Sequence, residues 1–115
     1  MRLFDLFKSN PIKKKILAIK RDSKMIVSNS CNEKYWIDWF GAYQINPEHL
    51  SFWICVMSDD MKMKLKSDNE LYKKLRYLLE KHNYPLEARD EVSFSFESQQ
   101  TVDRESRGSW HVHLQ

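Results

Sequence analysis

Residues 67–85 read SDNELYKKLRYLLEKHNYP, and this stretch carries the clearest structural signals in the chain. Ser67-Asp68-Asn69-Glu70 matches a capping box, in which the Ser hydroxyl and the Glu carboxylate bond free N–H groups at the start of a helix. Asn83 and Pro85 are residues that end helices. Between these signals, one apolar stripe recurs at helical spacing: Leu71, Leu75, Leu78 and Leu79. The stretch therefore predicts an amphipathic helix.

A second amphipathic helix is expected over residues 11–21. Asn10-Pro11 places a capping side chain before a proline at the first helical position, and apolar residues then recur at helical spacing among lysines. Residues 25–27 suggest a short strand. The aromatic-rich stretch 34–43 and the apolar stretch 50–57 also favour strands, the second one covered on both faces.

The C-terminal part predicts two more strands. Apolar and polar residues alternate over 92–97 and again over 110–115, as in strands with one buried face. The polar stretch 98–108 between them is expected to be a loop, with Gly108 supplying an unusual backbone angle before the last strand. Near the N-terminus, apolar spacing over 3–7 suggests a short helical turn.

These elements predict a single α+β domain over residues 1–115. The expected architecture is a mostly antiparallel sheet of four to five strands, with two main helices packed on one face.

Composition excludes several classes of protein. The chain is 42% hydrophobic and 30% charged, which is typical of a globular domain, and its two glycines leave little room for a phosphate-binding loop. The longest apolar run, Phe52–Met57, is far too short to cross a membrane. The first residues lack the features of a secretory signal, so Cys31 and Cys55 are expected to be buried, inert thiols in the cytoplasm.

The charges follow the predicted elements. Residues 1–34 carry nine basic and three acidic residues, and residues 62–89 carry eight basic and four acidic residues. Residues 35–61 carry four acidic and no basic residues, and residues 90–115 carry five acidic and two basic residues. The helices are therefore expected to form a positive side, and the strands with their loops a negative side.

His111 and His113 are the nearest approach to a chemical motif. On a strand they would share a face and could bind a metal or act as an acid–base pair in a histidine-dependent enzyme. The spacing of the remaining His and Cys residues supports no third ligand, so no metal or cofactor is expected.

Nucleic-acid binding is an alternative function. Lys13-Lys14-Lys15 with Lys20 and Arg21 could contact phosphates, and the aromatic stretch 34–43 could stack on bases. The competing interpretation is a solvated helix face beside a core of aromatic residues, and the sequence pI of 8.8 is low for a nucleic-acid-binding domain.

The sequence contains no catalytic motif such as HExxH, a P-loop or a nucleophile elbow, so we do not expect an enzyme. What remains is an acidic surface that bears aromatic and histidine side chains and suits docking onto a basic protein. The residues predicted to bind this partner are Asp59, Asp60, Glu97, Asp103, Glu105, Trp110, His111 and His113.

Part of the chain resembles the small cytoplasmic immunity proteins of bacterial contact-dependent growth inhibition and related polymorphic toxin systems. The stretches that carry the resemblance are Leu71–Leu75, Tyr84-Pro85, Val92–Ser98, Val102-Asp103 and Gly108–Trp110. The resemblance implies that the chain binds and blocks a cognate toxin domain, often a nuclease, inside the cell that makes both. It assigns no functional residue.

Overall fold

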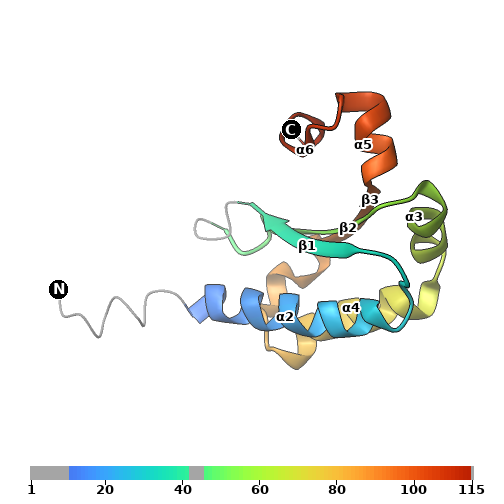
Figure 1. Ribbon diagram of the computed structural model, residues 1–115. Helices are drawn as coiled ribbons and strands as arrows, with labels where there is room; N and C mark the ends of the chain where they lie inside the picture. Colours follow the sequence, from blue (N-terminus) through green and yellow to red (C-terminus); the bar gives the residue numbers. More distant parts are fainter. Residues whose placement is uncertain (1–10, 42–45, 115) are drawn as a thin grey trace.

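The computed structural model describes residues 11–41 and 46–114, and in this part of the chain helices surround a three-stranded sheet (Figure 1). The helical turn expected over 3–7 lies outside the described residues, as does the end of the stretch 34–43. The elements in chain order are α2 (Pro11–Ser28), β1 (Tyr35–Phe40), β2 (Ser51–Val56), α3 (Asp59–Lys66), α4 (Asn69–Lys81), the 3-10 helix η1 (Leu86–Glu91), β3 (Ser93–Ser98), α5 (Gln99–Ser106) and α6 (Trp110–His113).

The sheet is mixed, with the strand order β1-β2-β3. β1 runs antiparallel to β2, with Ile37 opposite Ile54, whereas β2 runs parallel to β3, with Ile54 opposite Phe96. The α+β class is confirmed. The expected sheet of four to five mostly antiparallel strands is wrong, because the described residues form three strands and one of the two pairings is parallel.

The last predicted strand and the predicted loop before it are both helical. Residues 98–108 contain α5, and the stretch expected to form a strand over 110–115 begins with α6. The side chain of Ser98 accepts a hydrogen bond from the N–H of Thr101, and Ser109 accepts one from the N–H of Val112. These two N-caps start α5 in the stretch expected to be a polar loop and α6 in the stretch 110–115, whose apolar alternation is too short to specify a strand.

α3 was not expected at all. Asp59 and Asp60 form its first turn, where their negative charges interact favourably with the positive end of the helix dipole. Ser58 caps this helix by accepting a hydrogen bond from the N–H of Met61.

The helix predicted around the four leucines is confirmed as α4, and Leu71, Leu75, Leu78 and Leu79 are buried. Its capping residue is one position later than expected. Asp68, rather than Ser67, accepts the hydrogen bond from the N–H of Leu71, while the Ser67 hydroxyl donates to the C=O of Lys64 at the end of α3. Asn83 follows the helix with a positive φ of 52°, consistent with a helix stop.

α2 continues beyond its predicted end, so the expected strand at 25–27 is wrong. Ser23 and Val27 are buried on the same stripe as Ile16 and Ile19, and this spacing of three to four residues keeps the chain helical. None of the described helices is long and apolar enough to cross a membrane.

Helices lie on both sides of the sheet, not on one face as expected (Figure 1). α2 and α4 cover the face that carries Phe52, Ile54 and Phe96, which belong to the hydrophobic core. α5 and α6 lie on the opposite side, where the ring of Trp110 packs edge-on against Trp36 of β1.

Both cysteines are free and buried, as expected. Cys55 lies in β2 with no exposed surface. Its burial, together with the nearby carboxylates of Asp38 and Glu97, raises the pKa of the thiol to about 12.

Asp22 joins the two core helices through an ion pair. Its Oδ2 lies 2.7 Å from Nε2 of His82 and 3.0 Å from Nζ of Lys81, and its side chain is 15% exposed. The hydrogen bonds from His82 and Lys81 lower the pKa of the Asp22 carboxyl to about 2, although its partial burial opposes the shift.

We expect Asp22→Asn to lower the free energy of unfolding at pH 7 by about 1–2 kcal/mol, because the lowered pKa stabilises the folded state only while the carboxyl is ionised. A carboxyl with a folded pKa of about 2 contributes this stability above its ordinary pKa of 3.8 and loses it as the pH falls towards 2. Urea unfolding of both proteins from pH 7 downwards should therefore show a gap that narrows below about pH 4.

Asp90→Asn is the matched control, because Asp90 is exposed in η1. A gap between wild type and Asp22→Asn that stays constant to pH 2.5 would refute the assignment of this stability to the ionised carboxyl.

Candidate partner-binding surface

The eight residues predicted to bind a partner lie in one region, which we call the C-terminal corner: residues 59–62 at the start of α3 and residues 97–114. Contacts among α3, β3, α5 and α6 hold it together. Only Glu97 lies in a strand, so the expectation that these carboxylates belong to strands and loops is wrong. The other residues are distributed over helices as follows: Asp59 and Asp60 in α3, Asp103 and Glu105 in α5, and Trp110, His111 and His113 in α6.

A sharp turn sets the direction of α6. α5 ends at Ser106, its C-cap Arg107 has φ 52°, and Gly108 follows with φ 82°, so Arg107 and Gly108 are both in the left-handed region. The unusual backbone angle expected of Gly108 is confirmed. The turn folds α6 back onto α5 and over the sheet (Figure 1).

The carboxylate of Glu97 is the centre of the corner. Its Oε1 accepts hydrogen bonds from Nζ of Lys62 at 2.8 Å and from the N–H of Ser98 at 2.9 Å, and its Oε2 lies 2.7 Å from Nε2 of His113. Burial raises the pKa of this carboxyl, but the three hydrogen bonds together outweigh burial and hold the pKa below its ordinary value. Glu97 thus joins α3, β3 and α6.

His113 is enclosed in this network. Its side chain is 13% exposed, and its second ring nitrogen, Nδ1, lies 3.0 Å from Oγ of Ser106. His111 is exposed and lies on a different side of α6, since residues two apart on a helix do not share a face. The two imidazoles therefore do not form the acid–base or metal-binding pair that a strand would have placed on one face.

The described residues contain no group of three or more His, Cys, Asp or Glu side chains arranged to hold a metal ion.

Asp59 joins the start of α3 to the start of α5. Its Oδ1 accepts hydrogen bonds from the hydroxyls of Ser98 and Thr101 at 2.6 and 2.7 Å, and its Oδ2 accepts one from Arg104 at 2.9 Å. The hydrogen bonds from Ser98, Thr101 and Arg104 hold the pKa of this carboxyl well below its usual range. Asp59 and Glu97 therefore already have partners within the chain.

A pocket of about 400 Å³ opens between β1 and α6, and we call it the β1–α6 pocket. Trp110 in its wall is held firmly, because its ring centroid lies 5.2 Å from that of Trp36 and its Nε1 donates to Gln99 at 2.7 Å. The residues that line this pocket are Asp38, Phe40, Trp110, His111 and Leu114.

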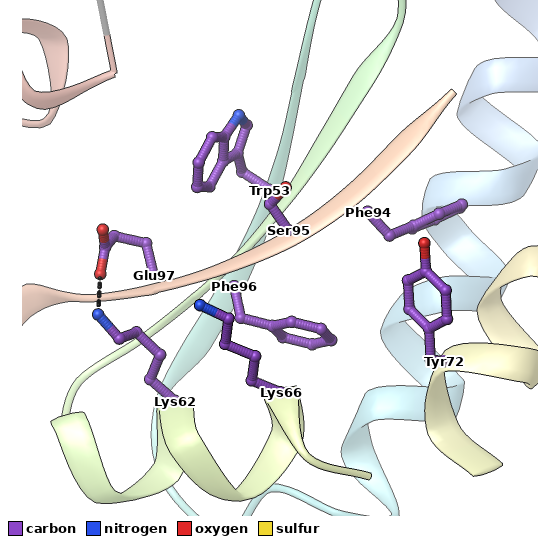
Figure 2. A pocket seen from close by; sticks show the side chains of 8 residues that line it. All are labelled: Trp53, Lys62, Lys66, Tyr72, Phe94, Ser95, Phe96 and Glu97. Carbon is purple, nitrogen blue, oxygen red and sulfur yellow. Dashed lines mark hydrogen bonds and ion pairs between the residues drawn. The ribbon is translucent and has the colours of Figure 1, made fainter. Parts of the chain in front are cut away.

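A second pocket, of about 410 Å³, follows the other edge of the sheet, and we call it the β3 pocket (Figure 2). Figure 2 shows Trp53 and Ser95 on one side of β3, and Phe96 with Lys62 and Lys66 on the other. The pocket extends along β3 towards Tyr72 of α4.

The charges separate only in part. α2 carries six Lys and Arg residues and one Asp, so the positive helix layer is present as expected. On α5, however, Arg104 lies between Asp103 and Glu105, and Arg107 follows. The corner presents exposed carboxylates among arginines rather than a continuous negative surface.

Sequence reasoning missed the contribution of β1 and the β3 pocket. Asp38 and Phe40 alternate with Ile37, which is in the core, and Trp39, which packs against it, and this period of two could have assigned Asp38 and Phe40 to the opposite face of the sheet. No local pattern could have placed them beside α6, because that contact depends on the turn at Gly108.

Comparison of the chain with protein families, with curated proteins and with solved structures finds no match.

We expect His113→Ala to release α6 from β3, because none of the residues of α6 is fully buried and this ring makes its hydrogen bond to Glu97 of β3. The free energy of unfolding should fall by about 1–2 kcal/mol, the usual cost of losing a hydrogen-bonded partner of a charged group. The indole N–H signals of Trp36 and Trp110 should also shift in NMR spectra.

His49→Ala is the matched control, because the His49 side chain is 56% exposed and lies outside the corner. Unchanged indole signals in His113→Ala would contradict the anchoring role of His113.

Proposed function

We propose that this chain is a protein-binding module that neutralises a toxin domain, as the immunity proteins of bacterial contact-dependent growth inhibition do. The observation that supports this function best is the β1–α6 pocket, which combines exposed aromatic surface with the carboxylate of Asp38. The partner is a basic protein, such as a nuclease domain that binds phosphates with Lys and Arg side chains.

The chemistry of the β1–α6 pocket suits a Lys or Arg side chain of such a partner. Phe40 is 47% exposed and Trp110 forms a second aromatic wall, so the aliphatic stem of the incoming residue can pack on rings. Asp38 then provides a charge partner for the cationic head, which the aromatic faces also attract. A rigid aromatic residue in a pocket is a frequent anchor of protein interfaces.

The residues of the corner divide into two roles under this proposal. Asp60, Asp103 and Glu105 are exposed and attract a basic partner over distance. Asp59 and Glu97 hold the corner together through their internal hydrogen bonds and do not meet the partner directly.

Nucleic-acid binding through α2 is a second candidate function, favoured by the six basic residues of this helix. It requires oligonucleotide binding that weakens steeply as salt increases. Absence of binding at low salt would eliminate it.

The test first asks whether a reading frame next to this one encodes a toxin domain, and that domain is then purified and immobilised. We expect Asp103→Lys and Glu105→Lys each to slow association about tenfold at low ionic strength while dissociation changes little, because exposed charges act mainly on the encounter rate. Trp110→Ala should act mainly on dissociation, because it removes the wall of the pocket.

Glu80→Lys makes the same change of charge on the exposed surface of α4, away from the corner, and should leave both rates unchanged. If Glu80→Lys and Asp103→Lys slowed association with the toxin domain equally, the C-terminal corner would not be the docking surface. Failure of the chain to bind the domain or to protect cells from it would overturn the proposed function.

A further inference from the structure

β3 forms one edge of the sheet, and part of its backbone points away from β2. The N–H of Ser93 donates to the C=O of Leu50, the residue just before β2, at 3.2 Å. Alternate residues of a parallel strand face the same neighbour, so Ser95 also turns its N–H and C=O towards β2. Phe94 and Phe96 consequently direct their N–H and C=O groups towards the open edge.

At both ends of this edge, side chains of the protein form hydrogen bonds with the outward backbone groups. The guanidinium of Arg76 donates to the C=O of Val92 before β3. At the other end, the N–H of Ser98 donates to the carboxylate of Glu97 at 2.9 Å. No hydrogen bond from the described residues reaches the outward groups of the two phenylalanines between these ends. A gap of about two residues therefore remains, with the β3 pocket beside it.

The side chains around this gap differ between the two sides of β3 (Figure 2). Lys62 and Lys66 of α3 lie on one side, and Trp53 lies on the other. Lys62 is paired with Glu97, whereas Lys66 is exposed and forms no ion pair with any described residue. The side chains of an added strand would point alternately to its two faces. Those on one face would lie near Lys66, and those on the other near the ring of Trp53.

We propose that the open edge of β3 binds an extended, acidic segment of a partner protein as a fourth strand. The N–H and C=O groups of Phe94 and Phe96 pair with the backbone of this segment, as in other cases of strand addition. Its acidic side chains face Lys66, and its apolar side chains cover Trp53. A second copy of this chain fits the edge less well, because its own Lys66 would approach the first.

This site lies at the edge of the sheet opposite to β1, so it is separate from the β1–α6 pocket and does not depend on the toxin-binding proposal. Its charge preference is also opposite, since the β3 edge selects an acidic segment and the β1–α6 pocket a basic side chain.

The test uses the whole chain and a capped eight-residue peptide that alternates valine with glutamate, with a lysine-for-glutamate peptide as its counterpart. Amide hydrogen exchange is followed by NMR with and without saturating peptide. We expect the acidic peptide to slow exchange of the Phe94 and Phe96 amides by about tenfold, because strand pairing protects N–H groups that are open in the free protein. Lys66→Glu should weaken binding of this peptide about fivefold.

Lys74→Glu is the matched control, because Lys74 is exposed on α4 and outside the β3 pocket, and it should leave the affinity within about twofold. Asp103→Lys should likewise not affect the peptide, which separates this site from the C-terminal corner. Absence of binding at millimolar peptide, equal binding of the lysine peptide, or protection of amides other than Phe94 and Phe96 would overturn the proposal. So would dimerisation of the free chain that protects these two amides, because the occupant would then be a second copy.

Discussion

The parallel pairing of β2 with β3 is the constraint on which the rest of the structure depends. Parallel neighbours begin at the same end of a sheet, so the chain must cross back between them. α3, α4 and η1 make this crossing and bring the leucine stripe of α4 against the core. The pairing also places β3 at an edge of the sheet, and α5 begins immediately after this strand. Both candidate binding sites therefore follow from one strand pairing.

The two sites differ in how they are built. The open edge of β3 consists of backbone groups, and the side chains of Phe94 and Phe96 anchor this strand in the hydrophobic core. The C-terminal corner instead depends on polar contacts, because α6 buries no residue and is held by Glu97 and by the edge-on contact of Trp110 with Trp36. Conservative substitutions of Glu97 should therefore alter the β1–α6 pocket more than they alter the hydrophobic core.

Local sequence patterns predicted those elements that carry an uninterrupted period. The leucines of α4 and the alternation over 92–97 both lead to elements of the expected type. The alternation over 110–115 wrongly predicted a strand because it is short. The helix-capping side chain of Ser109, just before it, starts α6 instead. Strand partners could not be read from the sequence, since they depend on contacts between distant residues. The predicted site residues nevertheless gather in one corner, although Asp59 and Glu97 turn out to hold it together.

The buried thiol of Cys55 has a chemical consequence. Only the thiolate reacts readily with alkylating agents and oxidants, and a pKa of about 12 leaves almost none of it at neutral pH. The chain contains two cysteines, and the other one, Cys31, is also buried. The folded protein should therefore resist covalent cross-linking between molecules in air, and a cysteine introduced on its surface would accept a fluorescent or spin label selectively.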